Sequence, residues 1–92
     1  MGMYLFVYGN FSDCPHDFEI VDGFSDHYAL QNFYEFVGGY SGIDKEMFYD
    51  MTRNLPFQKA VKLFNALCPR YEIKKVFSGL NEVSIKDGDG NA

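Results

Sequence analysis

The chain has 92 residues, 47 % of them hydrophobic and 23 % charged, a composition that is typical of one globular domain and not of a disordered protein. Its net charge of −5 and isoelectric point near 4.7 argue against a nucleic-acid-binding domain, since such domains usually have isoelectric points above about 9. No stretch approaches the roughly 18 consecutive apolar residues of a membrane span, and the start lacks a signal-peptide pattern. We therefore expect a cytoplasmic domain.

The first predicted elements are two strands. Residues 3–8 are a continuous apolar and aromatic run that ends at Gly9, which is typical of a central strand. Residues 18–22 form a second, shorter strand that ends at Gly23. Serine, aspartate and proline in residues 9–17 favour turns, so this segment is predicted to be a loop.

Three helices are predicted next. Apolar residues at a spacing of three to four indicate a first helix over residues 25–37, capped by Ser25 or Asp26 and ended by two glycines. Asp44 is the predicted N-cap of a short second helix. A third helix begins near Pro56 and runs to about Leu67. The second helix is expected to bury an apolar side made of Met47, Phe48 and Met51.

Two short strands complete the predicted domain. Residues 71–77 and 82–86 have strand composition, and residues 78–81 suit a hairpin loop between them. The polar, glycine-rich residues 87–92 are expected to form a flexible tail. The order ββαααββ predicts a single α+β domain over residues 1–86, with a mostly antiparallel sheet that carries the helices on one face.

The sequence contains no convincing pattern for a catalytic cysteine or for a metal site. Cys14 and His16 lie two residues apart, but in a predicted loop with no oxyanion hole beside them. Together with His27 and Cys68 they supply ligand types suitable for zinc, without the closely paired spacing of a structural zinc site. We therefore predict no enzymatic activity, no metal and no cofactor.

The charges are sorted by position along the chain. Residues 1–52 hold nine carboxylates and one lysine, a net charge of −8, whereas residues 53–92 hold seven cations and four carboxylates, a net charge of +3. Crowded like charges oppose compaction, so we interpret the acidic half as an anionic face that imitates phosphates. An ordinary solvated acidic surface is the alternative. The predicted partner-binding residues are Asp13, Asp17, Glu19, Asp22, Asp26, Asp44, Glu46 and Asp50, with Tyr28, Tyr40 and Tyr49 as aromatic anchors.

In size, charge and aromatic content, though in no motif, the chain resembles small acidic proteins of phages and mobile elements. Such proteins often act by occupying a binding surface of a host protein. The resemblance implies a non-enzymatic interaction module, an inhibitor that binds the basic nucleic-acid-binding groove of a host protein or complex.

A nucleic-acid-binding module in the basic half is the alternative function. It would use Lys59, Lys62, Lys74 and Lys75 together with a stacking aromatic ring. Strand alternation places the adjacent Lys74 and Lys75 on opposite faces, which weakens this reading. Ten phenylalanines and seven tyrosines also exceed what so small a core can enclose, which leaves aromatic surface for a homodimer.

Overall fold

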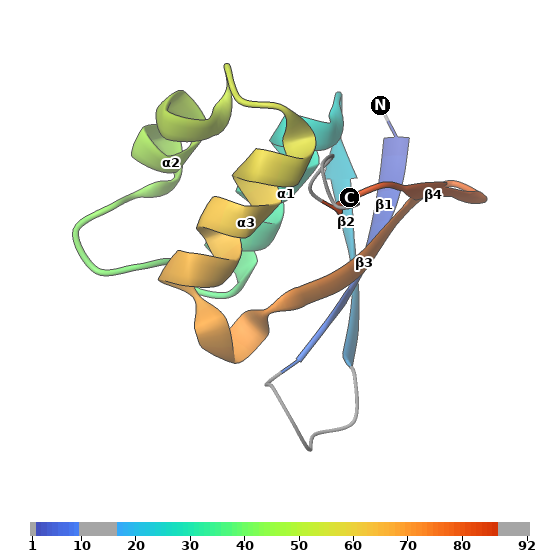
Figure 1. Ribbon diagram of the computed structural model, residues 1–92, viewed down its shortest axis with the longest axis horizontal. Coiled ribbons are helices and arrows are strands. Elements are labelled where there is room, and N and C mark those ends of the chain that lie inside the picture. The colour runs from blue at the N-terminus through green and yellow to red at the C-terminus, as the bar shows by residue number, and fades with distance from the viewer. Residues whose placement is uncertain (1, 10–16, 87–92) are drawn as a thin grey trace.

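A computed structural model describes residues 2–9 and 17–86, and its elements follow the predicted order (Figure 1). None of the helices in these two ranges combines the length and the apolar character needed to cross a membrane. The elements are β1 (Gly2–Tyr8), β2 (Asp17–Gly23), α1 (Asp26–Phe36), α2 (Lys45–Thr52), α3 (Phe57–Leu67), the 3-10 turn η1 (Pro69–Tyr71), β3 (Ile73–Ser78) and β4 (Asn81–Val83).

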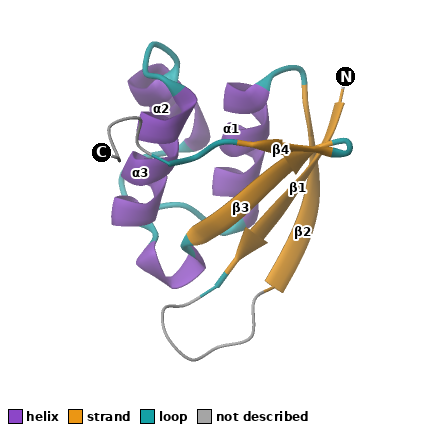
Figure 2. Ribbon diagram, turned by 45° about the vertical axis from the view of Figure 1, so that its right-hand side comes forward, coloured by secondary structure: helices purple, strands orange, loops and turns teal. Residues whose placement is uncertain are grey.

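The four strands form one antiparallel sheet in the order β2-β1-β3-β4. The apolar first strand is therefore central, as its composition predicted, and β2 and β4 are the edges. The three helices form a second layer on one face of this sheet (Figure 2). The predicted α+β class, the antiparallel sheet and the one-sided helix layer are confirmed.

Stacked aromatic rings fill the space between the sheet and the helices. Phe6 of β1 stacks on Phe33 of α1 with ring centroids 4.6 Å apart, and Tyr34 of α1 stacks on Phe48 of α2 at 4.2 Å. Phe64 of α3 lies 5.4 Å from the Phe33 ring and 6.1 Å from the Phe48 ring. The central strand and all three helices thus meet in one aromatic core.

Both predicted helix caps on α1 and α2 are present. The Ser25 hydroxyl accepts a hydrogen bond from the Tyr28 N–H at 3.4 Å, and the Asp44 carboxylate accepts one from the Met47 N–H at 2.9 Å. Each cap satisfies a main-chain donor that the first turn of a helix leaves without a partner. The N-terminal ends of these two helices are therefore determined by local residues.

The predicted apolar side of α2 is only partly correct. Phe48 is fully buried, but Met47 and Met51 expose 47 % and 43 % of their surface. Thr52 is instead buried on the core side of this short helix. Its hydroxyl tolerates burial because it donates a hydrogen bond to the Phe48 carbonyl at 2.9 Å. A helix of eight residues has few core positions, and its neighbours decide which residues occupy them.

The last two strands also differ from prediction at their ends. β3 begins at Ile73, two residues later than predicted, because η1 occupies the preceding chain. The Asn65 side chain of α3 holds that start, accepting from the Ile73 N–H at 2.8 Å and donating to its carbonyl at 3.3 Å. β4 already ends at Val83. Gly79 has a φ of 61° at the first of two central hairpin positions, the pattern of a type II′ turn.

Candidate protein-interaction surface

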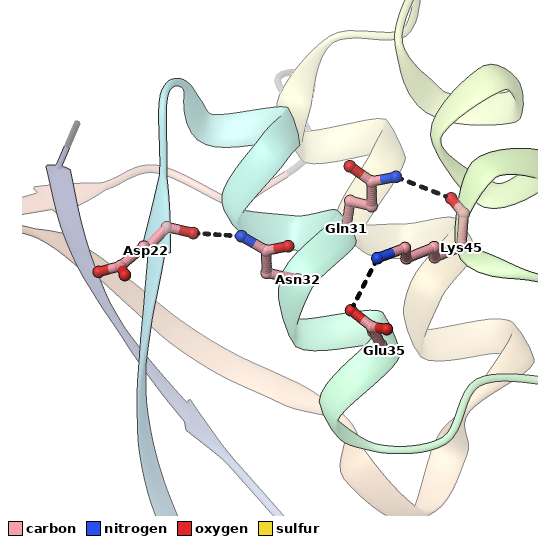
Figure 3. A network of polar contacts seen from close by, with 5 residues as sticks. All are labelled: Asp22, Gln31, Asn32, Glu35 and Lys45. Atoms are coloured by element: carbon pink, nitrogen blue, oxygen red, sulfur yellow. Dashed lines mark hydrogen bonds and ion pairs between the residues drawn. The ribbon is translucent and has the colours of Figure 1, made fainter.

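Helix α1 lies between β2 and α2 and makes polar contacts with both (Figure 3). The Asn32 side chain donates to the Asp22 carbonyl of β2 at 2.5 Å, and the Gln31 side chain donates to the Lys45 carbonyl of α2 at 3.2 Å. The Lys45 ammonium also pairs with the Glu35 carboxylate at 3.2 Å. These contacts join β2, α1 and α2 into one continuous part of the surface.

The fold converts the charge order of the sequence into a separation in space. Residues 17–52, which make up β2, α1 and α2, hold eight carboxylates and one lysine, a net charge of −7; we call them the acidic side. Residues 53–86, which make up α3, β3 and β4, hold seven cations and two carboxylates, a net charge of +5; we call them the basic side. These two groups of elements carry net charges of opposite sign, and such a charge distribution orients charged partners as they approach.

The solvent side of α2 carries two exposed predicted carboxylates. Glu46 and Asp50 are four residues apart, so they lie one above the other on the helix, and both are exposed. The Arg53 guanidinium lies 3.9 Å from the Asp50 carboxylate, both largely in solvent. Such an exposed pair contributes little stability. Asp44 precedes this helix as its N-cap, and one of its carboxylate oxygens accepts from the Met47 N–H.

The predicted carboxylates of β2 are divided between the two faces of the sheet. Glu19 pairs in register with Phe6, so it faces the helix layer, and Asp17 shares that face. Asp22 pairs with Met3 and faces the opposite side. Asp13 lies outside the described residues, as do Cys14, His16 and the predicted tail.

Asp26 connects the acidic side to the core. Its carboxylate accepts a hydrogen bond from the Tyr4 hydroxyl of β1 at 2.8 Å, which anchors the first turn of α1 to the central strand. Burial, followed by this hydrogen bond, raises the pKa of Tyr4 above its ordinary value. Asp26 therefore has a structural role in addition to its charge.

Three aromatic rings contact one another near the point where β2 passes into α1, and two of them, Phe24 and Tyr28, are exposed. Tyr28 of α1 lies on Tyr49 of α2 with ring centroids 4.8 Å apart and an interplanar angle of 19°, and Phe24 meets the edge of Tyr28 at 5.8 Å. Phe24 exposes 75 % of its surface. We call Phe24, Tyr28 and Tyr49 the aromatic ladder. The sequence predicted both tyrosines as anchors and missed Phe24, whose position just after the strand-ending Gly23 was the available signal.

The third predicted anchor, Tyr40, lies away from the ladder. It follows the C-terminal end of α1, a helix about 16 Å long, whereas Tyr28 lies in the first turn. The Tyr40 N–H donates to the buried Tyr34 hydroxyl at 2.8 Å, and that hydroxyl donates to the Ile43 carbonyl at 2.5 Å. Tyr40 thus belongs to the α1–α2 connection, with its ring half exposed.

The basic side contains a hollow that the sequence did not predict. Its volume is about 620 Å³, and Lys74, Lys75 and Lys86 all line it. The two adjacent lysines were expected on opposite faces, but a β-bulge interrupts the alternation, because Val7 pairs with Lys75 while Tyr8 pairs with Ile73. A smaller hollow of about 320 Å³ next to it is lined by Lys62 and Glu72. Lys59 is exposed on α3.

No protein-family model, curated protein or solved structure matches this chain.

The described part of the chain offers no evident site for metal or thiol chemistry. Within residues 2–9 and 17–86, no three histidine, cysteine, aspartate or glutamate side chains gather closely enough to hold a metal ion. Cys68 is buried at the end of α3, and burial raises the pKa of its thiol, which disfavours the reactive thiolate. His27 is occupied in the structure, with its Nε2 2.8 Å from the Leu55 carbonyl.

The buried hydroxyls and the buried thiol predict loss of stability at high pH. Burial raises the pKa of Tyr4, Tyr8, Tyr34 and Cys68 above ordinary values of 10.0 for tyrosine and 9.0 for cysteine. The unfolded chain therefore releases these protons at lower pH than the folded chain, and ionisation favours unfolding. We expect urea denaturation to give the same free energy of unfolding at about pH 7 and 8.5, and a lower one at about pH 10.5. A free energy that rises over the alkaline interval would contradict this assignment.

Proposed function

We propose that this protein is a non-enzymatic interaction module whose acidic side binds the basic, nucleic-acid-binding groove of a protein partner and thereby inhibits it. The observation that supports this proposal is the aromatic ladder within a surface of net charge −7. Carboxylates steer association and determine which partners are tolerated, whereas rings that lose water in an interface supply much of the affinity. The acidic side offers both.

The arrangement imitates the two features that such grooves recognise in nucleic acid. A groove that binds single strands combines cations for the phosphates with side chains on which the bases stack. Glu46 and Asp50 offer oxygens to lysine and arginine as phosphates do. The parallel rings of Tyr28 and Tyr49 offer a flat apolar face beside them. Occupation of the groove by these groups excludes nucleic acid from it.

Direct nucleic-acid binding by the basic side is the second candidate, and the β-bulge is the observation that favours it. The bulge brings Lys74 and Lys75 to one hollow, which Lys86 also lines and in which a phosphate backbone would bind. However, Glu82 lines the same hollow, and the Lys74 ammonium is already paired with the Glu72 carboxylate at 3.0 Å. These two carboxylates offset much of the local positive charge, so this function ranks second.

Charge reversal on α2 distinguishes the two functions. The double variant Glu46→Lys with Asp50→Lys is expected to bind its protein partner about 10- to 100-fold more weakly, because attraction to the groove becomes repulsion. Tagged protein is used to recover partners from bacterial lysate at low and high salt, with protein and nucleic acid both identified. The affinity of each recovered protein is then measured with and without competing DNA or RNA. A genuine partner is released by salt and displaced by nucleic acid.

The control changes the net charge by the same amount on the basic side. Glu72→Lys with Glu82→Lys should leave the affinity of that partner nearly unchanged. Equal weakening by both double variants would show that only net charge matters and would refute an acidic docking side. Recovery of nucleic acid alone, bound more tightly by the control variant, would establish the second candidate instead. Phe24→Ala tests the ladder, since this ring is 75 % exposed and its loss should weaken binding more than it affects folding.

A further inference from the structure

The face of the sheet opposite the helices is mostly apolar, and we call it the open face because none of the helices in the described residues covers it. Met3, Leu5 and Val7 of β1 point to this face, because Tyr4 and Phe6 between them point into the core. The strand register adds neighbours on both sides of β1. The open face consists of Met3, Leu5, Val7, Phe18, Ile20, Asp22, Lys75, Phe77 and Glu82.

Large apolar side chains on the open face remain in solvent. Phe18 exposes 63 % of its surface, Met3 58 % and Ile20 57 %. All three lie in adjacent strands, so their exposed surfaces are contiguous. Single exposed apolar residues are common, but a contiguous patch on a small domain usually marks an interface. The helices of the described chain all lie on the other side of the sheet (Figure 2).

The charged residues of the open face lie at its rim. Two of them, Asp22 and Lys75, have opposite charges and can pair between two copies of the chain. Asp22 lies beside Met3 at one corner, and Lys75 lies beside Val7 at the opposite corner. Strand spacing and rise separate these corners by about 16 Å within one molecule, too far for contact. A two-fold symmetry axis in the plane of the interface, perpendicular to the line from Asp22 to Lys75, exchanges these two corners. It brings Asp22 of each copy to Lys75 of the other copy. The strands of the two sheets then cross steeply, close to the orthogonal class of sheet packing.

Pairing through the β2 edge is a less favourable route to a dimer. Two β2 strands side by side would bring together the carboxylates of Asp17, Glu19 and Asp22 from each copy, with no cation in either strand. The Met3 carbonyl accepts a hydrogen bond from the Gly79 N–H, so the main-chain groups of Met3 point towards β3 and away from β2. Asp22 lies opposite Met3 in β2, and its own main-chain groups therefore point to the outer edge of the sheet. The Asn32 side chain already occupies the Asp22 carbonyl there.

We propose that the open face is the interface of a symmetric homodimer, in which Asp22 of each copy lies against Lys75 of the other. Packing two such faces removes Phe18, Ile20 and Met3 from water, which is the main driving force. The helix layers then lie on the outside of the dimer, so the face of α2 used in the proposed function stays accessible. The dimer therefore does not depend on that function.

Sedimentation velocity between about 1 µM and about 1 mM tests the interface. The wild-type chain should shift from monomer to dimer across this range. Ile20→Lys and Met3→Lys should each weaken association about 30-fold or more, because both would bury a charge in an apolar contact. Met47→Lys is the matched control, a similarly exposed methionine on α2 that should not change association. Circular dichroism verifies that each variant is folded.

Charge exchange tests the predicted contact between copies. Asp22→Lys and Lys75→Asp should each weaken the dimer about 10-fold, and the double variant should recover most of the wild-type affinity. Recovery requires contact between copies, since the two positions are about 16 Å apart within one chain. A wild-type chain that stays monomeric at about 1 mM would overturn the proposal. So would a dimer that Ile20→Lys leaves intact, or a double variant weaker than both single variants.

Discussion

Replacing Phe33 by alanine is expected to lower the free energy of unfolding by about 3–5 kcal/mol. The Phe33 ring is fully buried and lies 4.6 Å from Phe6, 5.1 Å from Tyr8 and 5.4 Å from Phe64, measured between ring centroids. Its loss removes apolar contacts and leaves a cavity between the sheet and two helices, which rigid neighbouring rings fill poorly. A chain of this size has a total stability of roughly 5–14 kcal/mol, so the variant should be close to unfolding. Urea denaturation followed by circular dichroism measures the change.

Phe36→Ala provides the control for this prediction. Phe36 lies in the same helix, with its ring centroid 5.9 Å from that of Phe33, but it exposes half of its surface. Its replacement should cost about 1.5 kcal/mol or less, because little apolar surface returns to water. Equal losses from the two variants would contradict the assignment of Phe33 to the centre of the core.

Gly23→Ala is expected to lower the free energy of unfolding by about 3 kcal/mol, through steric overlap at the junction of β2 and α1. A Cβ atom on Gly23 would lie 2.6 Å from the Ala29 nitrogen and 2.8 Å from its Cα and Cβ atoms. These are main-chain and Cβ atoms of a helix, which cannot rotate away as a long side chain can. The helix must shift as a unit, and urea denaturation should detect the cost.

The cross-strand neighbour of Gly23 supplies a matched control. Gly2 pairs with Gly23 in register, yet a Cβ on Gly2 would meet its nearest atoms at 3.7 and 3.8 Å, which is ordinary contact. Gly2→Ala should therefore be nearly neutral. Because α1 must move in Gly23→Ala, the near-ultraviolet signal of the stacked Tyr28 and Tyr49 should also change. Equal stability of the two alanine variants would refute close packing at this junction.

The aromatic ladder depends on the same close approach. Gly23 lets the first turn of α1 lie directly against β2, and α1 in turn places Tyr28 beside Tyr49 of α2. The sequence indicates that both tyrosines fall outside the core stripes, but it does not show that they meet. It also does not show that Phe24 contacts Tyr28 or that Tyr40 lies apart from both tyrosines.

Local chemistry explains why so much of the fold was predictable. Ser25 and Asp44 cap helices through hydrogen bonds to residues three positions ahead, and a run of apolar residues forms the central strand. Each of these signals lies within a few residues of the element that it determines. The order of elements, the fold class and the separation of charge along the chain follow from the sequence alone.

The faces of these elements were decided only by tertiary structure. The bulge in β3 that brings Lys74 and Lys75 to one hollow arises from pairing with β1, which lies far away in the sequence. Strand alternation puts Glu19 and Asp22 on opposite faces of the sheet, but only the pairing of Glu19 with the core residue Phe6 decides that Glu19 faces the helices. Met47 is exposed because the side of α2 that packs into the core is the one that holds Phe48 and Thr52. Contacts between distant segments select the surface that each side chain reaches, and local residue patterns carry no record of those contacts.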